Sequence, residues 1–160
     1  MKLSSGRPLF AKNMKPGKYA VYGGNGINGR HDQFFVDAPI LVIGRVGAYC
    51  GAIHVTEPKS WVTDNALYVT EYLRKVDQDF LALMLEDLNL NRFAKVGGQP
   101  SVSQGTVLSQ AVCLPTLSIQ HEVVAEIKTE RALVEANREL ARRFEQKLQI
   151  KLSEIWGDKA

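Results

Sequence analysis

The amino-acid sequence predicts an α+β protein in which a small, twisted, mixed or antiparallel sheet with peripheral helices precedes one long C-terminal helix suited to coiled-coil pairing. Residues before Pro115 alternate short β-branched and aromatic runs with glycine-containing turns, a pattern typical of strands joined by loops. Residues 118–158 hold a single glycine and no proline, so nothing in that stretch interrupts a helix. We therefore predict two domains, residues 1–117 and residues 118–160.

Four runs in the first domain predict strands. Residues 19–23 form a short run that ends in glycine, and residues 39–47 form the apolar run of a buried strand. Residues 50–56 alternate as an antiparallel neighbour of that strand would, with residues 47–51 as the turn. A further strand is predicted over residues 61–70.

Two helical segments are predicted in the same domain. Residues 76–93 carry apolar side chains at helical spacing, which indicates an amphipathic helix. Its apolar face is predicted to consist of Phe80, Leu83, Met84, Leu88 and, less regularly, Leu90. A loop with Gly97, Gly98 and Pro100 follows, and residues 103–115 are predicted to form a helical turn and a final strand.

The second domain is predicted to be one helix from about Ser118, as its N-cap, to Trp156, with Gly157 ending it. At 1.5 Å per residue it would be about 55 Å long, more than a domain of this size is wide. Its apolar stripe therefore needs a partner helix, and we predict a coiled coil. The predicted seam consists of Val123, Ile127, Val134, Asn137, Ala141, Phe144, Leu148, Leu152 and Ile155. Asn137 either fixes the register of the seam or is merely tolerated there, and both interpretations stay open.

Charge is distributed unevenly along the chain. The formal net charge is +3, from 20 Lys and Arg and 17 Asp and Glu. The first 120 residues contain twelve basic and nine acidic residues, whereas the last 40 contain eight of each. The surplus therefore lies in the first domain, which mildly favours a polyanionic partner.

Composition and cysteine content indicate the class of protein. The 45% hydrophobic and 23% charged content is that of a globular protein. No run approaches the roughly 20 apolar residues that cross a bilayer, and the N-terminus lacks the apolar core of a secretory signal. Cys50 and Cys113 lack metal or redox spacing. We predict a cytoplasmic protein with two structural thiols, no metal and no membrane association.

Catalytic motifs are not supported by their surroundings. Residues 24–29 match Gly-x-Gly-x-x-Gly formally, but a dinucleotide site needs a helix directly afterwards, and none is predicted. An Asn-Gly-rich loop between strands explains these residues. His31, His54 and His121 are isolated from one another and from acidic clusters, so no metal site is predicted. We predict no enzymatic activity and favour a binding module.

Polar side chains in and around the predicted loops suit DNA. Lysines neutralise phosphates, while Asn, Gln and Arg form bidentate pairs with adenine or guanine. The candidate DNA-binding residues are Lys12, Lys15, Lys18, Asn25, Asn28, Arg30, His31, Lys59, Gln99, Ser101, Ser103 and Gln104. For each of them, a solvated surface lysine or a plain turn residue is the alternative interpretation.

Five segments, in this order along the chain, resemble the specificity subunit of type I restriction-modification enzymes. They are residues 19–32, 40–55, 61–69, 97–115 and 130–158, which together extend over nearly the whole chain. The resemblance is to one target recognition domain followed by one conserved spacer helix. It implies that Ile43, Gly44, Arg45, Gly47, Gly51 and residues 63–67 build the framework of the fold.

The resemblance implies sequence-specific DNA recognition without catalysis. In the family, each recognition domain reads one half of a split target from the major groove, and the helices of two halves pair antiparallel. The implied partners are double-stranded DNA, a DNA adenine methyltransferase (modification) subunit, a restriction subunit, and a second specificity half or a second copy of the chain. S-adenosylmethionine, ATP and Mg²⁺ are expected only on the partner subunits, so no cofactor is expected in this chain.

The chain departs from the family pattern in its number of parts. An intact family member has two recognition domains and two helices, whereas this sequence has one of each. A half-sized subunit that dimerises, an excised fragment and the C-terminal recognition domain of a fused DNA adenine methyltransferase all remain open. A protein-interaction module that has lost DNA binding is the competing function.

Overall fold

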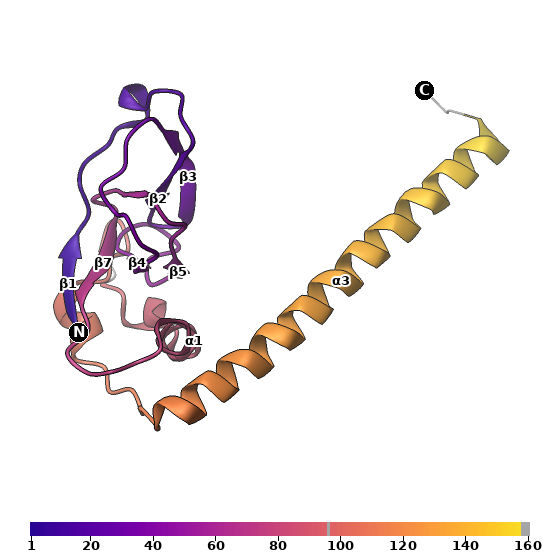
Figure 1. Cartoon of the computed structure of the whole chain (residues 1–160). Helices are drawn as coiled ribbons and strands as arrows, with labels where there is room; N and C mark the ends of the chain where they lie inside the picture. Colours follow the sequence, from indigo (N-terminus) through magenta and orange to yellow (C-terminus); the bar gives the residue numbers. More distant parts are fainter. Residues whose placement is uncertain (96, 158–160) are drawn as a thin grey trace. The chain divides into compact units, whose positions relative to one another are not determined.

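The computed structural model describes residues 1–95 and 97–157. Internal contacts divide the chain into two compact units, Met1–Gln120 and His121–Ala160, which we call the body and the C-terminal unit. The body contains two sheets and short helices, and the C-terminal unit is helical (Figure 1). The α+β class is thus confirmed, while the last three residues of the predicted second domain lie outside the described residues.

The larger sheet has four antiparallel strands in the order β1–β7–β4–β5. These strands are β1 (Lys2–Ser5), β4 (Leu41–Gly44), β5 (Ile53–Val55) and β7 (Ala66–Glu71). All four residues of β4 are buried, as expected for an apolar run that pairs on both sides. The predicted antiparallel pairing of the two adjacent runs is confirmed, because β5 pairs with β4 in that direction.

The smaller sheet has three strands in the order β3–β2–β6. β2 (Tyr19–Gly23) coincides with the predicted strand and forms an antiparallel hairpin with β3 (Gly26–His31). On its other side, β2 pairs in parallel with β6 (Trp61–Val62). β2 and β3 lie at one end of the body and helix α1 (Gln78–Leu88) at the other (Figure 1).

Two hydrophobic cores receive side chains from opposite faces of β4, because successive residues of a strand point to opposite sides. The larger core consists of Leu41, Ile43, Cys50, Ile53, Leu67, Val69, Leu81, Ala82, Leu85, Leu90, Val102 and Val107. The smaller core consists of Ala20, Tyr22, Val36, Val42, Val62 and Ala66. β4 therefore links the packing of the two sheets.

The predicted helix over residues 76–93 is shorter in the structure and is followed by a separate turn. Helix α1 begins after Asp77, whose carboxylate accepts a hydrogen bond from the Phe80 N–H at 2.9 Å. It ends at Leu88 because Asn89 adopts a left-handed conformation with φ 49°. The 3₁₀ helix η2 (Leu90–Phe93) follows.

The predicted apolar face of α1 was partly wrong. Leu81 and Leu85 are buried, whereas Leu83 and Met84 are only partly buried. Apolar residues occupy six consecutive positions here, 80–85, so their spacing alone does not select the face that packs on the sheet.

The single strand predicted over residues 61–70 was wrong. A turn closed by the Ala66 N–H donating to the Thr63 carbonyl at 3.1 Å divides this run into β6 and β7. β6 joins the smaller sheet and β7 the larger one. The run thus carries the chain from one sheet to the other.

Three further predictions are corrected by the structure. Residues 26–31, expected in a loop, form β3, and β1 was not predicted at all. The short helix expected after Ser103 is present as α2 (Gln104–Leu108), but residues 109–115 form no strand. The remaining short element is the 3₁₀ helix η1 (Ala11–Asn13).

The long helix is present as α3 (Leu117–Trp156). It begins one residue before Ser118, which therefore is not the N-cap; the Gln120 N–H donates to the Thr116 carbonyl at 3.0 Å. Gly157 has φ 70°, which confirms it as the residue that ends the helix.

Candidate nucleic-acid interface

Three of the candidate lysines, Lys12, Lys15 and Lys18, are exposed in the segment that precedes β2. The segment is attached to β3 at two points. The Lys15 backbone N–H donates to Nδ1 of His31 at 3.1 Å, and the Lys18 carbonyl accepts from Nη1 of Arg30 at 2.7 Å. The hairpin strand therefore fixes the backbone that carries these lysines.

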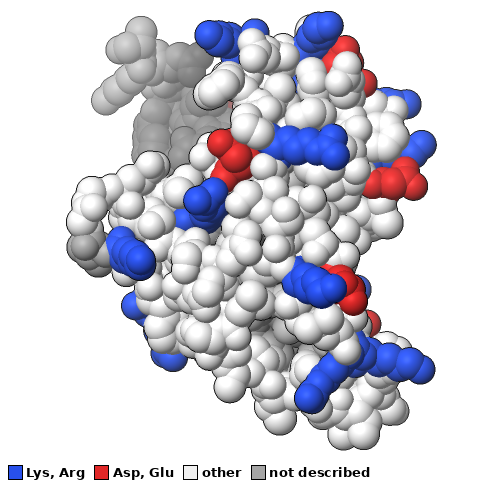
Figure 2. Space-filling model, turned by 90° about the vertical axis from the view of Figure 1, so that its left-hand side faces the viewer, with Lys and Arg blue, Asp and Glu red and all other residues white. Residues whose placement is uncertain are grey.

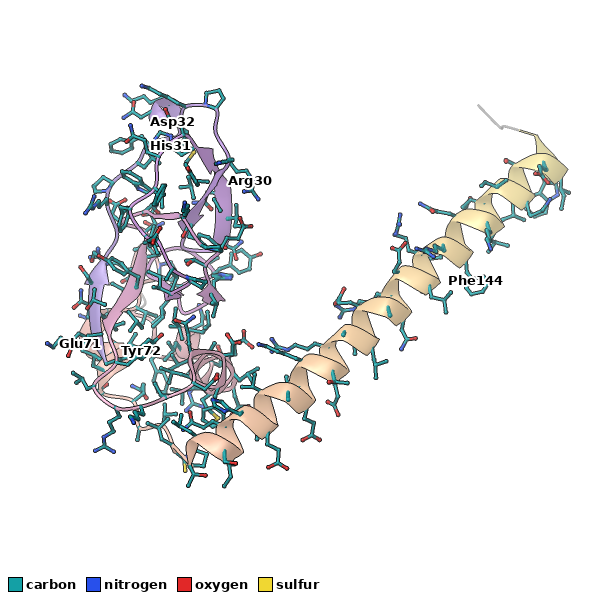
Figure 3. The ribbon with its side chains drawn as sticks, viewed as in Figure 1. Arg30, His31, Asp32, Glu71, Tyr72 and Phe144 are labelled. Carbon is teal, nitrogen blue, oxygen red and sulfur yellow. The ribbon has the colours of Figure 1, made fainter. Side chains whose placement is uncertain are left out.

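Arg30 projects from β3 and engages partners within the body (Figure 3). Its Nη1 and Nη2 lie 3.3 Å from the two carboxylate oxygens of Glu57, in a paired arrangement. Nη1 also donates to the Lys18 carbonyl. The side chain remains 49% exposed, so it is accessible to a ligand although its donors are engaged.

His31 lies at the end of β3, next to Asp32 (Figure 3). It is buried, and its ring packs edge-on against Trp61 at 5.7 Å between centroids. Nδ1 accepts from the Lys15 N–H when the ring is neutral, and Asp32 Oδ1 lies 3.2 Å from the same nitrogen. In the structure His31 supports the lysine-bearing segment from inside the body; a contact between His31 and DNA stays an untested prediction.

Lys59, far from these lysines in sequence, joins Lys18 through a pair of aromatic rings. Lys18 Nζ lies 5.4 Å from the centroid of Tyr19, and Lys59 Nζ lies 5.6 Å from that of Phe34. The two rings pack together at 4.7 Å. We call these four residues the lysine–aromatic cluster; such stacking orients an ammonium group without neutralising it.

Three polar loops meet beside the β2–β3 hairpin. A Cβ atom on Gly24, at the hairpin turn, would lie 2.8 Å from the Val46 carbonyl oxygen. Val46 in turn forms a bridge with Ser101, and the Gly47 N–H donates to the Pro100 carbonyl at 2.9 Å. The fold therefore brings together candidates that are more than seventy residues apart in sequence.

The remaining candidates differ in their surroundings. The side chains of Asn25, Asn28, Gln99 and Gln104 are exposed, and Ser101 is half-buried. Ser103 is the N-cap of α2, where its Oγ accepts from the backbone N–H of residue 106 at 3.1 Å. The structure thus gives Ser103 a local structural role, and its contact with DNA stays untested.

Sequence reasoning missed three exposed apolar residues in the same segments. Phe10 is 66% exposed, Tyr49 64% and Ile27 49%. Ile27 and Tyr49 are large apolar residues with a glycine within two positions on either side, and this contrast is a signal in the sequence; Phe10 has no such signal.

The stripe along α3 is open to solvent. Of the predicted seam residues, Val134, Asn137, Ala141, Phe144, Leu148 and Ile155 are exposed, and Val123, Ile127 and Leu152 are partly exposed. Leu133 and Leu140, not included in the predicted seam, are 61% and 51% exposed and lie four residues before Asn137 and Phe144. Residues four apart are neighbours on a helix, so these two leucines widen the stripe.

Several charged side chains of α3 form ion pairs within the helix. Glu139 accepts from Arg142 and from Arg143, both at 2.8 Å, and these contacts lower the pKa of its carboxyl. Arg138 contacts Glu135 at 2.7 Å, and Lys151 contacts Glu154 at 2.6 Å. Charge in the second half of this helix is thus partly balanced by neighbouring side chains.

Surface charge, metal ligands and membrane spans complete the description of residues 1–95 and 97–157. On the face shown in Figure 2, Lys and Arg side chains are spread over the surface, several of them beside a carboxylate. Among the described residues, no group of three or more His, Cys, Asp or Glu is arranged to hold a metal ion. Nor does any helix in that part of the chain have the length and apolar character needed to span a membrane.

Comparison with known proteins gives consistent similarities. The family model described as type I restriction modification DNA specificity domain matches residues 2–141. The type I restriction enzyme EcoprrI specificity subunit of Escherichia coli is 29% identical over 130 residues, which cover 78% of this chain and 32% of that protein.

A solved structure shares the fold. The crystal structure of the type I restriction-modification system S subunit from M. genitalium superposes with a TM-score of 0.65 at 18% identity. The similarity covers 92% of this chain and 42% of the M. genitalium chain. This chain therefore spans less than half the length of either relative.

Proposed function

The chain belongs to the family of type I restriction-modification DNA specificity domains, and from this premise we propose that its body reads one half of a split DNA target. The observation that carries the proposal is that the family match extends through the body and into α3. The family match thus covers the body together with the first part of α3.

The convergence of the polar loops supports base recognition by the body. Asn25 at the hairpin turn and Gln99 in the loop around Pro100 are exposed, and the backbone contacts of Val46 connect their loops. An exposed amide side chain can pair with adenine through two hydrogen bonds in the major groove. We propose Asn25, Asn28, Gln99 and Gln104 as the candidates for base contacts.

The exposed lysines support contacts with the DNA backbone. Phosphate contacts fix register and orientation but carry no sequence information themselves. We propose that Lys12, Lys15, Lys18 and Lys59 make such contacts. We further propose that the chain has no catalytic activity of its own, and that S-adenosylmethionine, ATP and Mg²⁺ act on the modification and restriction subunits.

The exposed stripe of α3 supports a role in assembly. A continuous apolar face on an exposed helix indicates a partner. We propose that α3 pairs antiparallel with the helix of a second specificity half or a second copy, and that the paired helices dock the modification subunit. The helix would then set the distance between two half-targets. A cytoplasmic location stays a prediction.

Selection from a pool of random duplexes tests the proposed function. The chain is mixed with the pool at low salt, bound duplexes are amplified, and the enriched sequences are compared. We expect enrichment of one short common sequence. Its affinity should fall with salt at a logarithmic slope of about −0.9 for each phosphate contact. Absence of an enriched sequence, together with affinity that is indifferent to salt, would contradict DNA recognition.

A further inference from the structure

Arg30 is the one arginine among the candidate DNA-binding residues, and its guanidinium is engaged by other parts of the body. It bonds to both carboxylate oxygens of Glu57 and to the Lys18 carbonyl. A bidentate contact with guanine needs two guanidinium N–H groups aimed at the base. In this structure the pair formed by Nη1 and Nη2 is aimed at Glu57 instead.

The two partners of Arg30 both belong to the surroundings of the lysine–aromatic cluster. Lys18, whose carbonyl Arg30 holds, carries one of the two ammonium groups of the cluster. Glu57 lies two residues before Lys59, which carries the other. Arg30, on β3, therefore links the Lys18 backbone to the turn that carries Lys59.

The contact between Arg30 and Glu57 matters for anion binding because Glu57 is negatively charged. Its side chain is 46% exposed and it lies two residues before Lys59, so we expect its carboxylate to act on a ligand that Lys59 binds. A carboxylate without its cation repels phosphate and attracts neighbouring ammonium groups. Asp32 and Asp37 are the other exposed acids nearby in sequence, and Asp32 is next to His31.

The cluster itself has the features of a phosphate-binding surface. Lys18 and Lys59 are exposed, and neither ammonium group is within salt-bridge distance of a carboxylate in the described contacts. The Tyr19 and Phe34 rings between them limit the directions that the lysine side chains adopt. Two oriented cations on one surface suit the regularly spaced phosphates of a DNA strand.

We propose that Arg30 is a positioning residue and not a base reader: it holds the Lys18 backbone and neutralises Glu57, so that Lys18 and Lys59 bind the phosphate backbone of DNA. This inference rests on the proposed function. The sequence alone placed Arg30 among the candidates for base contacts, and the inference gives it a different role. In that role, Arg30 strengthens DNA binding because it neutralises Glu57.

The inference distinguishes two effects of removing Arg30. Loss of a base contact lowers affinity for the target only, and so reduces discrimination. Loss of a positioning contact weakens phosphate binding, and so lowers affinity for all duplexes by the same factor. Removal of the Glu57 charge restores binding in the second case but not in the first.

The experiment measures affinity for the duplex enriched from the random pool and for a duplex with scrambled sequence. The proteins are the full chain and its Arg30→Ala, Glu57→Gln and double variants, with folding checked by circular dichroism. We expect Arg30→Ala to weaken both affinities equally, by about fivefold to tenfold, the scale of one lost charge contact. The double variant should regain most of that loss.

Lysine variants provide the matched control. Lys18→Gln and Lys59→Gln should each lower the logarithmic salt slope by about one. Lys75→Gln removes the same charge from an exposed position outside the cluster and should leave the slope unchanged. An equal effect of all three would mean that net charge alone matters, and would overturn the inference.

Two other results separate this inference from the proposed function. If Arg30→Ala removes discrimination while the double variant shows no recovery, Arg30 reads a base and the inference is wrong, although DNA recognition stands. If the unmodified chain enriches no sequence and binds no duplex, the proposed function fails, and the inference fails with it.

Discussion

The body and the C-terminal unit differ in where their apolar side chains lie. In the body, Leu41 and Ile43 are fully buried within cores that the unit supplies itself. In α3, Phe144 is 61% and Ile155 71% exposed. The body therefore buries its own apolar side chains, whereas the helix presents an apolar surface that association would bury. We therefore assign the stability of the fold to the body and propose assembly as the role of α3.

The largest expected difference concerns stability. Leu41→Ala removes a fully buried side chain from the larger core and should lower the free energy of unfolding of the body by about 2–5 kcal/mol. Phe144→Ala, which truncates an exposed residue of α3, should leave the unfolding midpoint of the body unchanged. Urea denaturation followed by near-ultraviolet circular dichroism measures both. Equal destabilisation by the two variants would contradict the assignment of stability to the body.

The next largest effect concerns association. Phe144→Asp places a charge in the exposed stripe and should weaken pairing of α3 by at least about thirtyfold, or about 2 kcal/mol. Analytical ultracentrifugation over a range of concentrations measures this change. Gln146→Asp introduces the same charge outside the predicted seam and serves as the control. If the chain has the same mass distribution with and without Phe144→Asp, the coiled-coil proposal is wrong.

A smaller difference in stability is expected between alanine substitutions of one glycine from each unit. Gly26, with φ 90°, lies against His54, and an added Cβ would be 3.2 Å from the ring. Gly157 also has a positive φ, of 70°, but nothing lies within 4 Å of an added Cβ. Gly26→Ala should therefore destabilise the body by about 1–2 kcal/mol, and Gly157→Ala should leave the body unaffected. The midpoints of thermal unfolding test this difference.

The smallest expected effect is the pH dependence of helix content. Arg142 and Arg143 lower the pKa of Glu139, so their contribution to helix stability is present above the ordinary glutamate value of 4.5 and is lost as pH falls through the lowered pKa. Helicity of α3 should decrease slightly over that acidic range. Glu139→Gln should remove this part of the decrease, as measured by circular dichroism at 222 nm. An identical acid titration for the variant would show that these ion pairs contribute nothing.

The sequence predicted the strands whose local pattern matches their final surroundings. β2 coincides with its prediction because its apolar residues end at a glycine, and β4 is buried on both sides, as an apolar run suggests. β3 was missed because Asn28 and its two glycines are typical of turns, and only pairing with β2 makes this segment a strand. The division of residues 61–70 depends on two different sheets, which a local pattern does not reveal.

The sequence predicted which residue types occupy the candidate site but not which of them contact one another. The sequence indicated the lysines and amides, yet the ion pair between Arg30 and Glu57 joins residues 27 positions apart. The packing of Tyr19 against Phe34, the rings that Lys18 and Lys59 contact, likewise depends on the folded backbone. Burial of His31 followed from its position at the end of β3, an element that the sequence did not predict.

The double-faced packing of β4 has a consequence for how such a molecule diversifies. Replacement of Val42 disturbs the packing of the smaller core, and replacement of Leu41 disturbs that of the larger core. This strand therefore tolerates little variation. The hairpin turn and the loops beside it contribute few side chains to either core. If those loops read DNA, as proposed above, new recognition sequences can be acquired by changing them, while the strand that connects the two sheets is constrained by both cores.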